Sequence, residues 1–89
     1  MAFRVLLLGA TGVFGARLAR RLAADGRFDP ILAGRTQGAL QALADEVSAE
    51  GRAVTVAVLD VFAGDFAARL ASLRPSLVIH AAGPFQAQD

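Results

Sequence analysis

The sequence predicts an α/β fold in which four parallel strands alternate with three helices, in the order βαβαβαβ. Four apolar runs have the length of strands, and the segments between them repeat apolar residues at helical spacing. Hydrophobic residues make up 55% of the chain, which suits strands covered by helices on both faces. Strand–helix–strand connections of this kind are right-handed and predict a parallel sheet. We expect the strand order 3-2-1-4, with which the usual six-stranded doubly wound sheet begins.

The first strand and the first helix have the clearest patterns. Residues 3–8 contain the uninterrupted apolar run from Val5 to Leu8, which is typical of a central strand. Residues 13–25 form the expected helix, because their apolar side chains recur every four positions and make one buried stripe. These side chains are Phe14, Leu18 and Leu22.

The middle of the chain repeats the same alternation. Residues 30–33 predict a second strand, which tolerates Pro30 because it stands first. Thr36 is a candidate N-cap for a helix over residues 37–50. The apolar face of this helix comprises Leu40, Leu43 and Val47.

The last part of the chain supplies the third and fourth strands. Valine alternates with smaller residues through 53–59, which indicates a strand with one less deeply covered face. A helix over 64–73 stops at Pro75, and residues 77–81 form the fourth strand. Residues 1–89 therefore hold one domain, which ends before the fifth and sixth strands usual in this fold. We expect the fourth strand to present a bare apolar edge, through which two copies pair.

Three glycines follow the first strand directly and precede the first helix. Gly9 permits the tight turn, Gly12 lets the backbone approach phosphates, and Gly15 lets the helix pack close to the strand. The helix N-terminus then offers free N–H groups and a partial positive charge to an anion. This spacing predicts a Rossmann-type dinucleotide-binding domain.

The residues after the second strand select the dinucleotide. An acidic residue at this place binds the ribose 2′-hydroxyl of NAD(H), but here the strand runs into Gly34, Arg35 and Thr36. The guanidinium of Arg35 pairs with a 2′-phosphate in our interpretation, and Thr36 adds a hydroxyl donor. The sequence therefore favours NADP(H) over NAD(H).

Two later loops are further candidates for contact with the cofactor. Asp60 and Val61 follow the third strand, where the carboxylate either accepts from the adenine amino group or caps the turn before the next helix. Ala82, Gly83 and Pro84 follow the fourth strand, where small residues either let the ribose and pyrophosphate pass close by or simply make a tight turn.

Composition excludes several other classes of protein. The chain has no cysteine, which excludes disulfides and is compatible with a cytoplasmic location. A single His80 cannot form a metal cluster, and we expect it to be either packed or exposed at the edge of the fourth strand, without a catalytic role. The nine basic residues are all arginines scattered along the chain, so no nucleic-acid surface is expected. No apolar run reaches the length of a membrane span.

With these motifs, the chain resembles the N-terminal NADP-binding domain of saccharopine dehydrogenase-like oxidoreductases. The matching segments are 9–15, 33–36, 60–61 and 80–86, of which the last is the most typical of that family. The resemblance implies an NADP-dependent oxidoreductase whose catalytic domain lies outside this chain, so no residue here is named as catalytic. It assigns the pyrophosphate to Gly9, Thr11, Gly12, Phe14 and Gly15, the 2′-phosphate to Arg35 and Thr36, the adenine to Asp60 and Val61, and the ribose side to Ala82, Gly83 and Pro84.

Two alternatives remain open at this point. The glycine motif also opens extended short-chain reductases and sugar epimerases, whose catalytic tyrosine and lysine lie further along the chain than this sequence extends. The fold also serves non-catalytic modules that bind NADP(H) as sensors or scaffolds.

Overall fold

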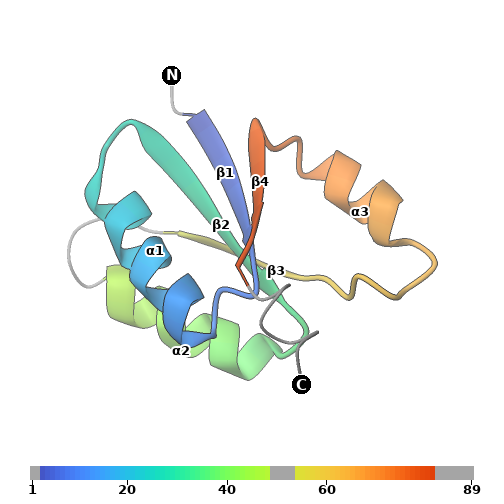
Figure 1. The fold of residues 1–89 in the computed structure, drawn as a ribbon, viewed down its shortest axis with the longest axis horizontal. Coiled ribbons are helices and arrows are strands. Elements are labelled where there is room, and N and C mark those ends of the chain that lie inside the picture. Colours follow the sequence, from blue (N-terminus) through green and yellow to red (C-terminus); the bar gives the residue numbers. More distant parts are fainter. Residues whose placement is uncertain (1–2, 49–53, 82–89) are drawn as a thin grey trace.

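A computed structural model describes residues 3–48 and 54–81 and contains one four-stranded parallel sheet with strand order β3-β2-β1-β4 (Figure 1). This order and the alternation of strands and helices confirm the predicted Rossmann-like fold. The strands are β1 (Phe3–Leu8), β2 (Phe28–Gly34), β3 (Thr55–Val58) and β4 (Leu77–His80). The helices are α1 (Val13–Ala24), α2 (Gln37–Ser48) and α3 (Phe66–Ser72).

The register of the sheet brings the carboxyl ends of the four strands together. Leu8, the last residue of β1, lies opposite Ala33 of β2 and His80 of β4. Gly34 at the end of β2 lies opposite Val58 at the end of β3. The loops that leave these ends therefore start at one edge of the sheet, at the bottom of Figure 1.

Helices cover both faces of the sheet, as the apolar strands predict. Leu7 and Leu32 point to the face packed by α1 and α2, where Leu40 of α2 is one of the most deeply buried side chains. Leu6 and Ile31 point to the opposite face, on the side of α3, whose Phe66 and Leu70 pack partly buried against this second core (Figure 1). Successive residues of β1 and β2 thus enter two separate cores, because side chains alternate along a strand.

Element boundaries differ from the sequence prediction by one or two residues. β2 begins at Phe28, before Pro30, because its first residues pair only with β1 while pairing with β3 begins at Ile31. Pro30 has no N–H to donate, and it lies before the part of β2 that pairs with β3, so no hydrogen bond to β3 is lost there. α3 runs over Phe66–Ser72 and is shorter than the predicted 64–73. The predicted end of α2 at 50 and the start of β3 at 53 lie outside the described residues.

The outer edge of β4 is apolar and exposed, as predicted. Leu77 is 47% exposed and Val78 is 39% exposed. Pairing of two copies through this edge stays a prediction. Within residues 3–48 and 54–81, no helix combines the length and apolar character needed to cross a membrane.

Candidate cofactor-binding site

The glycine loop turns sharply at the end of β1 and is attached to β2. Gly9 has a φ of 76°, a left-handed conformation that a side chain would strain. Its N–H donates to the carbonyl oxygen of Ala33 at 3.0 Å. The N–H of Gly12 then donates to the carbonyl oxygen of Gly9 at 3.2 Å. These bonds fix the loop where α1 begins.

Gly15 is required by the close packing of α1 on this loop. A Cβ atom at position 15 would lie 2.3 Å from the carbonyl oxygen of Gly9 and 2.9 Å from the Cα of Ala10. Both neighbours are backbone atoms, which cannot rotate away as the tip of a side chain does. The prediction that Gly15 allows close helix packing is confirmed.

Gly12 has no comparable steric requirement within the chain. Its φ of −72° suits any residue, and a Cβ there would meet its nearest neighbour, the Gly9 carbonyl oxygen, at an ordinary 3.6 Å. Its proposed role, keeping a Cβ away from a phosphate, concerns a ligand and stays a prediction.

The first turn of α1 presents its N–H groups without a side-chain cap. Gly12 occupies the N-cap position and makes no side-chain hydrogen bond, and the first turn has no acidic residue. A helix end of this kind attracts an anion, because its N–H groups lack acceptors and its dipole is positive there.

Arg35 and Thr36 lie where β2 passes into α2. The carbonyl oxygen of Thr36 accepts the N–H of Leu40 at 3.1 Å, which places Thr36 at the expected N-cap position of α2. Arg35 is exposed and forms no ion pair among residues 3–48 and 54–81. Within this part of the chain, no carboxylate competes with an external anion for its guanidinium.

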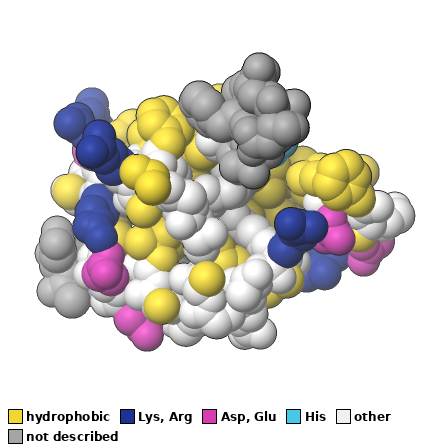
Figure 2. All heavy atoms as spheres, turned by 60° about the horizontal axis from the view of Figure 1, so that its bottom comes forward, with side chains coloured by type: hydrophobic (Ala, Val, Ile, Leu, Met, Phe, Trp, Pro, Cys, Tyr) yellow, Lys and Arg dark blue, Asp and Glu magenta, His cyan; other side chains and the backbone are white. Residues whose placement is uncertain are grey.

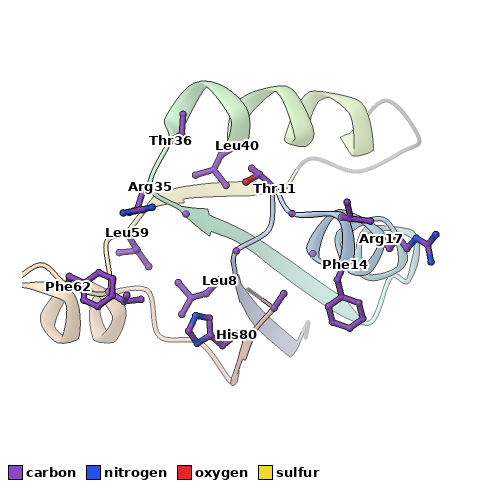
Figure 3. A pocket seen from close by; sticks show the side chains of 17 residues that line it. Leu8, Thr11, Phe14, Arg17, Arg35, Thr36, Leu40, Leu59, Phe62 and His80 are labelled. Atoms are coloured by element: carbon purple, nitrogen blue, oxygen red, sulfur yellow. The ribbon is translucent and has the colours of Figure 1, made fainter. Parts of the chain in front are cut away.

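These loops enclose a pocket with a volume of about 970 Å³ at the carboxyl ends of the strands, here called the carboxyl-end pocket (Figure 3). Its described lining contains two arginines, Arg17 and Arg35, and no carboxylate, so it favours a negatively charged ligand. Hydrophobic side chains are also exposed across this end of the molecule (Figure 2). The predicted site residues that line the pocket are Gly9, Thr11, Gly12, Phe14, Gly15, Arg35, Thr36 and Val61.

The remaining predicted site residues are placed differently. Asp60 is not among the lining residues, and its Oδ1 accepts the N–H of Phe62 at 2.9 Å. Asp60 therefore caps the turn, one of the two interpretations of this residue, and the contact with adenine stays a prediction. Ala82, Gly83 and Pro84 lie outside the described residues.

Several lining residues were not predicted from the sequence. Leu8, Leu40 and Leu59 form apolar parts of the wall, and their sequence pattern indicates only core packing. Phe62 carries a stronger signal, since it is a large apolar residue in the loop that follows the third strand. His80, expected to be packed or exposed at the edge of its strand, is exposed and also borders the pocket.

We expect Asp60→Ala to lower the free energy of unfolding by about 1 kcal/mol, because the Phe62 N–H loses its acceptor. Asp60→Asn keeps an oxygen at the same place and should unfold like the wild type. Urea unfolding of both variants measures the difference. Equal stability of all three proteins would contradict this role of Asp60.

The strand order, the glycine loop, the uncapped helix and the basic pocket are together those of a Rossmann-type nucleotide-binding domain. The model of the KR domain family matches residues 4–88, so the chain belongs to that family of short-chain dehydrogenases/reductases. No curated protein matches the chain.

Solved structures agree with this assignment. A short-chain type dehydrogenase/reductase from Mycobacterium ulcerans is 25% identical, with a TM-score of 0.78, over 93% of this chain and 34% of the other. The E. coli oxidoreductase yciK is 30% identical, with a TM-score of 0.73, over 91% of this chain and 36% of the other. A Sphingobium yanoikuyae short-chain dehydrogenase in complex with NADPH is 33% identical, with a TM-score of 0.69, over 76% of this chain and 27% of the other. The chain thus spans about a third of the length of these structures.

The expected membership of the saccharopine dehydrogenase-like family is wrong, because the KR domain model covers nearly the whole chain. The glycine motif did not separate the two groups, since both begin with the same strand, loop and helix. Segment 80–86 favoured the wrong family in the sequence analysis, and its residues 82–86 lie outside the described residues.

Proposed function

We propose that this chain is the NADP(H)-binding part of a short-chain-type oxidoreductase and holds the adenosine–phosphate half of the cofactor. Its family membership supports oxidoreductase chemistry. The proposal depends on one structural observation, the uncapped N-terminus of α1 opening into a pocket lined by arginines and no described carboxylate.

The pyrophosphate fits the glycine loop in this proposal. Gly15 lets α1 pack close to the loop, and Val13 and Phe14 of its first turn line the carboxyl-end pocket. Gly12 adds no Cβ on the approach to those groups. Such a backbone cradle binds phosphate without a basic side chain in contact.

Arg35 supports NADP(H) as the dinucleotide. It is exposed at the end of β2, lines the pocket and is joined by no described carboxylate. Arginine matches the geometry of a phosphate with two parallel N–H donors. The bound NADPH of the Sphingobium yanoikuyae relative is consistent with this choice.

The reduction itself belongs to the whole protein in our proposal. The carbonyl or alcohol substrate and the hydride-transfer residues are assigned to parts of the relatives that this chain does not span, so the isolated chain binds cofactor and does not turn over. A cytoplasmic location is retained in the proposal, and a chain without cysteine is compatible with it.

Titration with each half of the cofactor tests whether the chain binds the adenosine–phosphate half and not the nicotinamide half. We expect the chain to bind adenosine 2′,5′-bisphosphate with most of the affinity that it has for NADPH, and to bind nicotinamide mononucleotide much more weakly. Isothermal calorimetry measures all three. Nicotinamide mononucleotide that binds more tightly than adenosine 2′,5′-bisphosphate would contradict the proposal. Oxidation of NADPH by the isolated chain with a carbonyl substrate would also contradict it.

A further inference from the structure

Phe62 is the most exposed large hydrophobic side chain among residues 3–48 and 54–81. Its side chain is 86% exposed, whereas Phe66, at the start of α3, packs against the core. A single exposed phenylalanine is not unusual by itself. Phe62, however, also lines the carboxyl-end pocket, so its exposed ring faces the space that we assign to the cofactor.

The backbone at Phe62 is fixed although its ring is exposed. Asp60 Oδ1 accepts the Phe62 N–H at 2.9 Å, and the Asp60 carbonyl oxygen accepts the Ala63 N–H at 3.0 Å. Two hydrogen bonds that Asp60 accepts therefore define the turn that carries the ring. A fixed turn reduces the entropy that a contact with a ligand would cost.

Phe62 and Arg35 follow neighbouring strands of the sheet. Arg35 comes directly after β2, and Phe62 comes a few residues after β3, which pairs with β2 up to Val58. The Leu59 N–H donates to the Gly34 carbonyl oxygen at 2.8 Å, so the segments that follow β2 and β3 are still hydrogen-bonded where their loops begin. Figure 3 shows both side chains on the same side of the pocket, away from Phe14 and Arg17.

We propose that Phe62 forms an aromatic wall of the adenine subsite, with the base stacked on its ring and Arg35 at the adjoining 2′-phosphate. This inference rests on the proposed function. An adenine presents a flat apolar face, and stacking on an aromatic side chain recognises that face and not the hydrogen-bonding edge. In this arrangement Asp60 is a positioning residue that sets the ring through the turn.

Paired substitutions test this role. We expect Phe62→Leu, which stays apolar but is no longer flat, to weaken binding of NADPH and of adenosine 2′,5′-bisphosphate by about tenfold each. Phe62→Tyr keeps the ring and should bind both ligands like the wild type. Phe3→Leu is the matched control, since Phe3 is another partly exposed phenylalanine, at the opposite end of β1 and away from the pocket.

Calorimetric titration of each variant, with thermal unfolding to verify the fold, distinguishes the outcomes. Unchanged ligand binding by folded Phe62→Leu, where the wild type binds NADPH, overturns the inference and leaves the proposed function standing. Weaker NADPH binding with unchanged binding of the bisphosphate also overturns it, because the ring would then contact the nicotinamide half. Failure of the wild type to bind NADPH at all overturns the proposed function itself.

Discussion

Gly15→Ala is expected to destabilise the fold by about 3 kcal/mol, at the upper end of the usual cost of overpacking. The added Cβ would lie 2.3 Å from the Gly9 carbonyl oxygen, and both that oxygen and the Ala10 Cα belong to the backbone of the turn. Relief requires α1 to move away from β1, which loosens Ala19 and the other side chains that α1 buries. The loss of stability should therefore accompany a loss of cofactor binding.

Gly12→Ala is the matched control for this effect. Its Cβ would meet the same carbonyl oxygen at 3.6 Å, and its φ is acceptable to alanine, so the free energy of unfolding should change by no more than about 1 kcal/mol. NADPH binding should nevertheless weaken, because the new methyl group stands in the approach to the helix N-terminus. Urea denaturation and calorimetry separate the two substitutions. Equal destabilisation by both would contradict the distinction between a packing glycine and a ligand-approach glycine.

Arg35→Ala is expected to weaken NADPH binding by about 1.5–3 kcal/mol, the range for a hydrogen bond to a charged group. Binding of NADH should change little, because it has no 2′-phosphate for the guanidinium to contact. Arg35→Lys should recover part of the loss, since a lysine keeps the charge but not the planar pair of donors. Arg35 is exposed, so the fold should be unaffected.

The control for this experiment is Arg21→Ala. Arg21 is an exposed arginine in the last turn of α1 and does not line the pocket, so it tests whether loss of any positive charge weakens binding. Parallel calorimetry with NADPH and NADH gives the specificity of each variant. If Arg35→Ala weakened NADPH and NADH binding equally, a contact between Arg35 and the 2′-phosphate would be contradicted. The same conclusion would follow if Arg21→Ala weakened NADPH binding as much as Arg35→Ala does.

Most of the fold was predictable because local pattern and topology agree. The apolar run that ends at Leu8 and the four-residue spacing of Phe14, Leu18 and Leu22 predicted the first strand and helix. The predicted buried stripe was wrong at Phe14, which is 55% exposed, because α1 packs through its small residues. Right-handed crossovers reduce the possible strand orders to a few, and the glycine loop after the first strand favours the order 3-2-1-4 among them. Element ends were less predictable. β2 extends to Phe28, before Pro30, because its first residues pair only with β1, and this pairing depends on contacts between segments distant in sequence.

The site was predictable only where a residue acts through its backbone or follows a strand directly. Gly9 and Gly15 were recognised from spacing, since their roles in the turn and in helix packing depend on residues nearby in sequence. Phe62 was not, because its place on the pocket wall depends on the turn held by Asp60 and on the neighbouring end of β2. Family membership was misjudged for a related reason. The residues that distinguish the two families act beyond the shared strand, loop and helix.

The central claim is that this chain binds NADP(H) and that Arg35 contacts the 2′-phosphate. Calorimetric titration of the wild-type chain with NADPH and with NADH tests this claim most directly. The account predicts that NADPH binds at least about tenfold more tightly, a difference near 1.4 kcal/mol. Equal affinities would contradict the role of Arg35, and no heat of binding with either dinucleotide would contradict the cofactor site itself.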